Sequence, residues 1–277
     1  MRKPNLFIVG APKAGSSLLW QALKNHPEIF FSNNPEKEIN YFSFEELDRY
    51  SYYKDFKIRD IKKYLSLFRM GQTAKYLVDG SVSYFSFISV AKKIYKFNSD
   101  AKIVVIVRDP KARAYSHYNM DKRMGYADKP FLEYLNNKEN IYDKHIHQYI
   151  QNSLYYKHVN NYSKYFGKNQ LFVMQLEKIE NDIIRLCKFL DIDPIDFDFN
   201  NKVNENKTPK NIISKTLQHN RYLATILKRF IPRKVVKVFD PLFYKKAEIE
   251  PMSDLEMKLL DEYLKDDFLR FKKKYLT

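Results

Sequence analysis

Short apolar runs of strand length alternate along the chain with longer segments in which apolar residues recur at three- and four-residue spacing. The strand-like runs cover residues 6–9, 76–78, 103–107 and 171–174. The segments of helical spacing cover residues 17–25, 87–97, 111–122, 154–166 and 181–190. Strands that alternate with helices form parallel sheets with helices on both faces. The pattern therefore predicts an α/β protein with a central parallel sheet flanked by helices.

The remaining segments have different patterns. Residues 136–147 and 191–210 show little periodicity and are rich in Asn, Asp and Lys, so they are predicted to be loops or lids. Residues 217–243 and 253–275 return to helical spacing, which predicts a helical C-terminal part over residues 211–277. The sequence has no internal repeat and no low-complexity tract. We therefore expect a single domain over residues 1–277, with its motif-bearing core at residues 5–190.

Composition agrees with a globular protein and leaves the partner open. Of the 277 residues, 44% are hydrophobic, among them 21 Phe and 22 Tyr, which is enough to fill a sizeable core. The formal charge of +16 indicates an anionic ligand, polymer or surface, or it reflects a lysine-rich proteome. Because the basic residues are scattered and form no basic tail, we expect no nucleic-acid partner.

Two features bear on the compartment. Cys187 is the only cysteine, so an intrachain disulfide is impossible, and a core thiol in a reducing compartment is expected. The apolar stretch after the basic residues Arg2 and Lys3 ends at Gly10, which is too short for a secretory signal. No apolar run approaches the roughly 20 residues that cross a bilayer. The sequence therefore predicts a cytoplasmic protein with no membrane span.

A compact loop with two glycines follows the first strand-like run. It begins at Gly10, reaches its second glycine at Gly15, and leads directly into the first helical segment. Backbone amides in such a loop, together with the helix N-terminus, form an anion site. The glycine spacing is that of a Walker A loop, but Ser16 stands where that motif requires lysine, and Lys13 lies in mid-loop instead. The pattern predicts an anion site unlike that of a kinase, and a plain strand-to-helix turn with a solvated lysine is the alternative.

The segment Pro12-Lys13-Ala14-Gly15-Ser16-Ser17 resembles the 5′-phosphosulfate loop of the sulfotransferases, usually Pro-Lys-x-Gly-Thr/Ser-Thr/Ser. The resemblance implies that the donor is 3′-phosphoadenosine-5′-phosphosulfate (PAPS). It assigns donor binding to Pro12, Lys13, Ala14, Gly15, Ser16 and Ser17. It also gives Lys13 the role of main catalytic cation, because an ammonium there can stabilise charge on the phosphosulfate oxygens.

A second motif begins where the third strand-like run ends. The run leads into Arg108-Asp109-Pro110, in which Asp109 is the expected helix N-cap and Pro110 the first helical residue. Arg108 and Ser116 are then expected to converge at the carboxyl edge of the sheet. Their types and spacing resemble the 3′-phosphate motif of the sulfotransferases, which implies that both bind that phosphate. The alternative is that Arg108 pairs with Asp109 or another nearby carboxylate and that Ser116 is a surface residue of the helix.

A third segment, Lys37-Glu38-Ile39-Asn40-Tyr41-Phe42, resembles the Lys-Glu-x-x-x-Phe segment of carbohydrate-type sulfotransferases, in which the glutamate is the general base. A hydroxyl that attacks sulfur must lose its proton, and a carboxylate within hydrogen-bond reach can take it. The resemblance therefore makes Glu38 the base, with Lys37 near the sulfonate or orienting the carboxylate. A Lys-Glu pair on a solvated face is the alternative, and His26 is the second candidate base.

Two further segments extend the resemblance. Residues 79–85 resemble the family's Glu-Lys-Ser/Thr-Pro-x-Tyr segment, but Gly80 stands where many members carry a lysine. Lys37 and Lys75 are then the candidates for a second catalytic cation. The later half of the resemblance, which ends near residue 190, adds Tyr155 to the nucleotide site.

The resemblance implies a bacterial sulfotransferase of the carbohydrate, heparan-sulfate-sulfotransferase-like branch, which moves the sulfuryl group from PAPS to a hydroxyl or amine by direct in-line transfer. No cluster of His, Cys or carboxylate residues suggests a metal, so none is expected. The acceptor is expected to be a saccharide or an acidic glycan, and a small alcohol, a lipid or a peptide tyrosine is left open. Two other functions remain: a P-loop kinase-like phosphotransferase, which Ser16 disfavours, and a non-catalytic polyanion-binding protein on a sulfotransferase scaffold.

Overall fold

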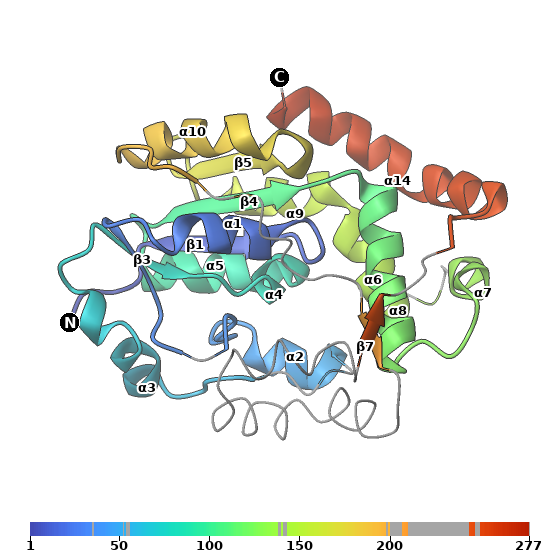
Figure 1. Ribbon diagram of the computed structural model, residues 1–277, viewed down its shortest axis with the longest axis horizontal. Helices are drawn as coiled ribbons and strands as arrows, with labels where there is room; N and C mark the ends of the chain where they lie inside the picture. The colour runs from blue at the N-terminus through green and yellow to red at the C-terminus, as the bar shows by residue number, and fades with distance from the viewer. Residues whose placement is uncertain are drawn as a thin grey trace.

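Five parallel strands form the central sheet of the computed structural model (Figure 1), in the order β2-β3-β1-β4-β5. The strands are β1 (Leu6–Gly10), β2 (Ile29–Phe31), β3 (Tyr76–Asp79), β4 (Lys102–Val107) and β5 (Leu171–Gln175). Because β1 pairs with both β3 and β4, the first strand lies at the centre. The structure describes residues 1–34, 36–51, 53, 56–137, 140, 143–197, 199 and 250–276, and the backbone alone of 207–209 and 244–246.

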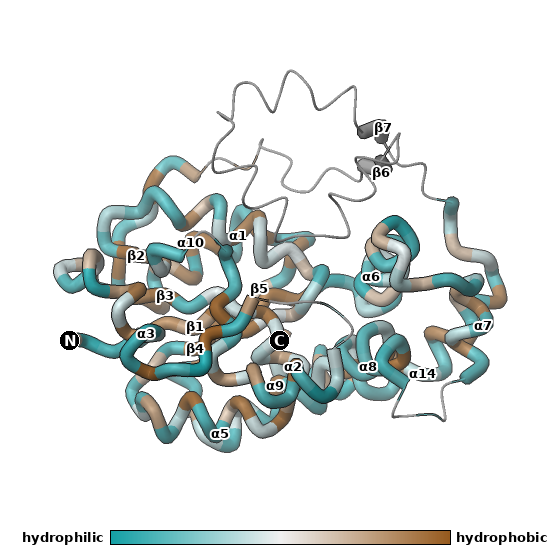
Figure 2. The backbone as a smooth tube through the Cα atoms, turned by 90° about the horizontal axis from the view of Figure 1, so that it is seen from below, coloured by the Kyte–Doolittle hydropathy of each residue, from teal (hydrophilic) through white to brown (hydrophobic). Residues whose placement is uncertain are grey.

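Helices cover the sheet on both faces. The covering helices are α1 (Ser16–Leu23), α5 (Ile88–Phe97), α9 (Tyr155–Tyr162) and α10 (Ile179–Leu190). Successive strand residues point to opposite sides of a sheet, so Leu6 and Ile8 pack toward α1 and α10, while Phe7 and Val9 pack toward α5 and α9. Figure 2 shows the strands between these two pairs of helices. The mainly apolar composition of the strands follows from this double burial.

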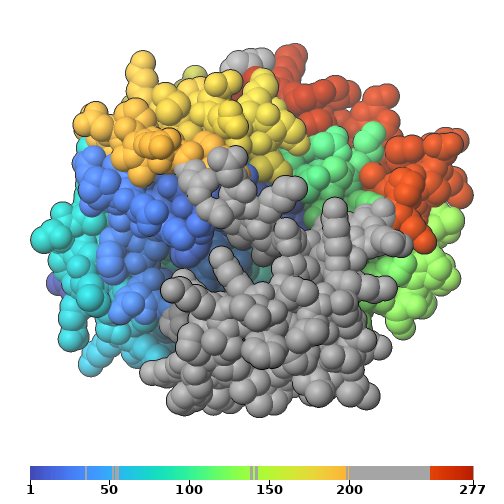
Figure 3. Space-filling model, viewed as in Figure 1, coloured from blue at the N-terminus to red at the C-terminus, as the bar shows by residue number. Residues whose placement is uncertain are grey.

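A second group of helices packs beside the sheet. Its members are α6 (Pro110–Met124), α7 (Phe131–Asn136), α8 (Lys144–Tyr149) and α14 (Asp254–Tyr275). They share a separate apolar cluster that includes Tyr118, Phe131, Tyr149 and Leu260. In Figure 3, α14 (red) lies against α6 and α7 (green). Helix α14 thus packs against α6, which begins at the carboxyl edge of the sheet, and helps to hold it in place.

Shorter elements make the connections. They are α2 (Phe44–Tyr50), α3 (Ile61–Ser66), α4 (Ser83–Ser86) and the 3-10 helices η1 (Arg69–Gly71), η2 (Gln151–Ser153) and η3 (Leu176–Lys178). Strands β6 (Lys207–Pro209) and β7 (Tyr244–Lys246) form a separate antiparallel pair. Within the described part of the chain, no helix has the length and apolar composition that crossing a membrane requires.

The α/β architecture predicted from the sequence is confirmed. The four strand-like runs correspond to β1, β3, β4 and β5, and each predicted helical segment up to residue 190 contains a helix, as does 253–275. Strand β2 escaped prediction because three residues are too few to show alternation. The loop prediction for 136–147 is wrong at its end, where α8 begins, and β6 lies within the predicted loop 191–210. The helix predicted at 217–243 lies outside the described residues.

Cys187 is buried in the apolar layer between the sheet and α10, as expected for a core thiol. Burial raises the pKa of its thiol to about 11, so the group stays protonated and unreactive near neutral pH. The reducing, cytoplasmic compartment that its presence suggested stays a prediction.

Candidate active site

The loop between β1 and α1 depends on two glycines and on one bond to the neighbouring strand. Gly10 (φ 155°) and Gly15 (φ 100°) have positive φ, which residues with a side chain rarely adopt. A Cβ on Gly15 would also lie 2.5 Å from Leu176 Cδ1. Ala11 N donates to the Ile106 carbonyl of β4 at 2.7 Å, which holds the loop at the carboxyl edge of the sheet. The first amides of α1 have no intrahelical partner at this edge, and such amides suit an anion.

Lys13 lies in the middle of this loop among other charged side chains. Its ammonium is 3.5 Å from Met120 Sδ on α6. Burial, with a smaller contribution from Arg123, lowers the Lys13 pKa to about 8, although Asp121 acts in the opposite direction. A cation buried among other cations is stabilised when an anion binds beside it. A turn with a solvated lysine therefore does not describe this loop.

Arg108 reaches the same loop from the end of β4. Its Nη1 donates to the Lys13 carbonyl at 3.4 Å, and its Nε is buried without a hydrogen-bond partner among the described residues. Asp109 does not pair with it but caps α6 by accepting from Ala112 N at 2.8 Å, with Pro110 at the first helical position. The predicted cap is confirmed, and the alternative of an Arg108–Asp109 pair is wrong. A buried donor without a partner costs free energy until a ligand meets it.

Arg113, in the first turn of α6, also forms a hydrogen bond with the loop. It is fully buried, and its Nη1 donates to the Pro12 carbonyl at 3.3 Å. Its Nε donates to Ser153 Oγ at 2.7 Å, so its guanidinium is held in place from behind. Two consecutive loop carbonyls, those of Pro12 and Lys13, thus accept from arginines that follow β4 in the chain.

The other two predicted nucleotide residues differ in exposure. Ser116 is half-buried in the second turn of α6. Tyr155 is fully buried at the start of α9, with its ring against Phe85 and Phe271 and its hydroxyl next to the backbone of Arg108. In this conformation Tyr155 therefore has no exposed surface for direct contact with a nucleotide, and its buried hydroxyl has no hydrogen-bond partner among the described residues.

The Lys37-Glu38 segment meets the loop from the other side. Lys37 Nζ donates to Ser16 Oγ at 3.0 Å. Burial lowers the Lys37 pKa, and the neighbouring Glu38 carboxylate raises it. A Cβ on Gly80 would lie 3.7 Å from Lys37 Cε, so the lysine side chain passes beside this glycine. Lys37 is therefore buried against the loop, so the alternative of a Lys37-Glu38 pair on a solvated face does not fit the structure.

The family model of the sulfotransferase domain matches residues 3–223, a range that contains the loop, the Lys37-Glu38 segment and Arg108. This chain belongs to the sulfotransferase family. The match covers all residues that the sequence assigned to the site. The family resemblance inferred from the three motifs is thus confirmed.

Individual relatives agree with this family. Heparan sulfate glucosamine 3-O-sulfotransferase 5 of Mus musculus and Homo sapiens is 26% identical over 201 residues, which are 69% of this chain and 54% of that protein. The Homo sapiens bifunctional heparan sulfate N-deacetylase/N-sulfotransferase 3 is 32% identical over 122 residues, which are 42% of this chain and 13% of that protein. This sulfotransferase spans about half the length of the first of these relatives. A sulfotransferase from Alicyclobacillus acidocaldarius has a crystal structure with a TM-score of 0.63 at 25% identity, over 81% of this chain and 97% of that one.

Two residues considered from the sequence lie away from this sulfotransferase site. Lys75, just before β3, forms an ion pair with Asp191, with Nζ and Oδ2 2.8 Å apart. His26 is buried in the turn before β2, where its Nε2 bonds to the Asp193 carbonyl at 2.7 Å and its Nδ1 accepts a backbone N–H. Of the two candidate lysines, Lys37 is thus the one that reaches the loop, and His26 is a turn residue.

Sequence reasoning missed the contribution of α6 to the surroundings of Lys13. Arg113, Met120 and Asp121 come from this helix, together with the buried His117. Tyr53 extends the group, since its hydroxyl bonds to His117 Nε2 at 2.8 Å and also to the Asp121 carboxylate. The three- and four-residue spacing of these positions puts them on one helix face, a signal that the sequence contained.

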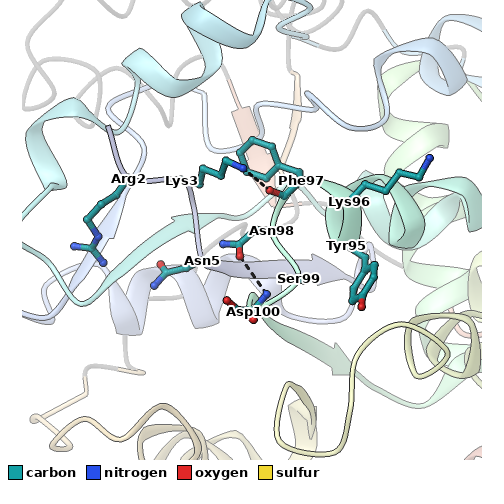
Figure 4. A pocket seen from close by; sticks show the side chains of 9 residues that line it. All are labelled: Arg2, Lys3, Asn5, Tyr95, Lys96, Phe97, Asn98, Ser99 and Asp100. Carbon is teal, nitrogen blue, oxygen red and sulfur yellow. Dashed lines mark hydrogen bonds between the residues drawn. The ribbon is translucent and has the colours of Figure 1, made fainter.

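A groove at the opposite edge of the sheet is separate from this site. It is lined by Arg2, Lys3, Asn5 and residues 95–100 (Figure 4), which precede β1 and β4. Lys3 Nζ donates to the Phe97 carbonyl at 2.9 Å, and the Arg2 guanidinium donates to the carbonyls of Gln72 and Lys75. Two of its cations, Arg2 and Lys3, are therefore already bonded to backbone.

Proposed function

We propose that this sulfotransferase transfers the sulfuryl group of PAPS to a hydroxyl or an amine of a saccharide, as a single domain over residues 1–277. The observation that carries the proposal is that two distant segments of the chain meet at one loop. Lys37 donates to Ser16 inside the loop, and Arg108 donates to the carbonyl of Lys13. Two lysines and an arginine then surround the place where a phosphosulfate would lie against the first amides of α1.

The donor would be bound at two points. The loop from Pro12 to Ser17 holds the 5′-phosphosulfate, and Arg108 with Ser116 holds the 3′-phosphate. The Nε of Arg108 is buried and has no hydrogen-bond partner in the part of the chain that the structure describes. This supports the assignment, because a phosphate oxygen would satisfy that donor. Tyr155, which is buried next to the backbone of Arg108, would contribute to this site by packing against Arg108.

In the reaction, Glu38 takes the proton of the acceptor as its oxygen or nitrogen attacks sulfur. The bond from sulfur to the bridging oxygen breaks, and its electron pair stays on that oxygen, which leaves with the 5′-phosphate. Lys13 stabilises the charge that gathers there, and it is protonated at neutral pH because its pKa is about 8. Lys37 contacts the sulfonate oxygens during transfer. Lysine and backbone donors thus supply the charge stabilisation in the proposed reaction.

The relatives support a saccharide acceptor. Those described above are named for action on heparan sulfate, one as a 3-O-sulfotransferase and the other as an N-sulfotransferase. The formal charge of +16 suits an acidic glycan. The proposal therefore includes both a hydroxyl and an amine as the attacking group.

Donor binding is tested by replacing Arg108 with alanine. A charge-assisted hydrogen bond contributes about 1.5 to 3 kcal/mol, so affinity for the desulfated product PAP should fall roughly 10- to 150-fold. Calorimetry with PAP and with AMP, which lacks the 3′-phosphate, should show that the preference for PAP is lost. Arg185→Ala is the matched control, because Arg185 pairs with Asp182 on α10, away from the loop. Equal affinity of the unaltered protein for PAP and AMP would contradict the assignment.

The base is tested by replacing Glu38 with glutamine, which keeps the shape but cannot accept the proton. Transfer from labelled PAPS to a panel of glycans that includes heparan sulfate should fall by about 100- to 10,000-fold. Affinity for PAP should stay nearly unchanged, and the acidic limb of the pH profile should flatten. Glu36→Gln, two residues earlier, is the control. Turnover near that of the unaltered protein would remove Glu38 from this role.

A phosphotransferase is the second enzyme to be tested, because the loop spans two glycines at Walker spacing. Ser16 disfavours it, since the Walker lysine is missing. Within the described residues, no group of three His, Cys, Asp or Glu side chains is placed to hold a metal ion. Phosphoryl transfer from ATP that depends on magnesium, without transfer from PAPS, would favour the phosphotransferase. Binding of PAP without turnover on any acceptor would instead favour a polyanion-binding protein.

A further inference from the structure

The hydroxyl of Ser81 lies directly behind the Lys37-Glu38 segment. Ser81 Oγ accepts from the backbone N–H groups of Ile39 and Asn40, at 2.9 and 3.0 Å. The same Oγ donates to Asp79 Oδ1 at 2.6 Å. A hydroxyl has one proton to donate and two lone pairs to accept with, so these three bonds use it completely. One atom thus fixes the two amides that follow Glu38.

Asp79, the last residue of β3, fixes the direction of the Ser81 hydroxyl. Its carboxylate is fully buried and also accepts from Ser81 N at 3.1 Å, from Tyr64 Oη at 3.0 Å and from Tyr84 Oη at 2.7 Å. Burial raises the pKa of Asp79, and these hydrogen bonds lower it. Because Ser81 gives its proton to this carboxylate, its lone pairs face the amides of Ile39 and Asn40.

Asn40, one of the two residues whose amides bond to Ser81, makes further hydrogen bonds through its side chain. Asn40 is buried and has a positive φ of 57°. Its Nδ2 donates to the Phe56 carbonyl at 2.8 Å, and its Oδ1 accepts from Ser83 Oγ at 2.6 Å. The backbone behind Lys37 and Glu38 is therefore tied to the end of a central strand.

We propose that Ser81 is the positioning residue of the catalytic pair. By joining the amides of Ile39 and Asn40 to the carboxylate at the end of β3, it sets where Lys37 stands relative to the phosphosulfate loop, which starts at the end of the adjacent strand β1. The inference rests on the proposed function, in which Lys37 contacts the sulfonate. It predicts that loss of the Ser81 hydroxyl impairs recognition of the sulfonate and leaves the rest of the nucleotide site intact.

The test compares the affinities of PAPS and PAP, which differ by the sulfonate, so no acceptor is needed. Calorimetry on the full chain would include Ser81→Ala, Ser81→Thr and Lys37→Met. We expect Lys37→Met to lower the ratio of PAPS to PAP affinity by about 10- to 150-fold, the value of a charge-assisted hydrogen bond. Ser81→Ala should lower that ratio by about 10-fold or more with PAP affinity unchanged, and Ser81→Thr, which keeps a hydroxyl, should restore it.

A control removes another buried hydroxyl from the same face of the sheet. Tyr162 Oη donates to the Tyr84 carbonyl at 2.9 Å and does not touch the Lys37-Glu38 segment, so Tyr162→Phe should leave the ratio unchanged. If Ser81→Ala does not fold, Ser81→Cys takes its place, because a thiol of similar size accepts hydrogen bonds only weakly.

The outcomes distinguish a failure of the positioning role of Ser81 from a failure of the proposed role of Lys37. If Lys37→Met lowers the ratio and the Ser81 variant does not, the positioning role is overturned while the proposed function stands. Parallel loss of PAPS and PAP affinity in the Ser81 variant also overturns it, since that would indicate a general structural role. If Lys37→Met leaves the ratio unchanged, the assigned role of Lys37 fails, and the positioning role falls with it.

Discussion

Replacing Lys13 with methionine is expected to stabilise the ligand-free sulfotransferase while it removes the proposed catalytic cation. The fold lowers the Lys13 pKa from 10.5 to about 8, chiefly by burial. One pKa unit corresponds to about 1.4 kcal/mol, so the protonated ammonium lowers the free energy of unfolding by about 3 kcal/mol at neutral pH. Methionine has similar length and no charge, and it can stay in contact with Met120. Most of that destabilisation should therefore disappear in the variant.

The gain should depend on pH in a defined direction. Below about pH 8 the folded and unfolded chains both carry the Lys13 proton, so the gain is present in full. Between about pH 8 and 10.5 the unfolded chain keeps the proton while the folded protein has released it, so the unaltered protein recovers stability relative to the variant. Above 10.5 the contribution of this residue vanishes.

Urea denaturation at pH 7 and pH 10, followed by circular dichroism, measures this difference. Other titrating groups are common to both proteins and cancel in the comparison. Lys122→Met, at an exposed position of α6, is the matched control and should change stability little at either pH. The reasoning would be refuted if Lys13→Met were no more stable than the unaltered protein at pH 7, or if its advantage did not shrink toward pH 10.

Three further predictions concern acid stability, the loop and metals. Burial lowers the pKa of His147 to about 4 and of His158 to about 3, from the usual 6.5, so stability should be complete above pH 6.5 and fall progressively as the pH drops toward 4. A flat profile of urea midpoints over that range would contradict this. Gly15→Ala should lower the free energy of unfolding by about 1 to 3 kcal/mol and abolish PAP binding, because Gly15 has a positive φ and a Cβ there would meet Leu176. Gly167→Ala is the control. The nearest atom to its Cβ would lie at 3.9 Å, so thermal unfolding should show almost no change in stability. Transfer from labelled PAPS should survive excess EDTA, and loss that magnesium restores would argue for the phosphotransferase.

The sequence predicted those parts of the fold that repeat a local rule. Four of five strands in the sheet were found because they are continuous apolar runs, and the cap at Asp109 was found because Asp-Pro after a strand has few other uses. The position of the loop after β1 and that of Arg108 at the end of β4 were predicted for the same reason, since each follows from a few adjacent residues. The helical segments up to residue 190 and the one at 253–275 were found from their spacing alone.

Contacts between distant residues were not predictable in this way. Nothing near Lys37 indicates that its ammonium ends at Ser16, and nothing near Arg113 indicates that it reaches Pro12. Tyr155 was placed in the nucleotide site by resemblance, but the packing of α9 and α14 buries its ring. In the sequence, Ser81 is one residue of a segment that differs from the family pattern at Gly80. Only the structure shows that its hydroxyl accepts hydrogen bonds from the backbone of Ile39 and Asn40.

The two arginine bonds to the loop carbonyls have a consequence for protein engineering. The loop between β1 and α1, which we propose to bind the phosphosulfate, occupies a short segment of the sequence between Gly10 and Ser17, which suggests that it could be transplanted. Its shape, however, depends on donors that follow it by 95 and 101 positions in the chain. The smallest portable unit is therefore the pair of neighbouring strands β1 and β4 with the helices that follow them. A graft of the loop alone would carry the amides proposed to bind the anion without the two arginines that bond to the loop.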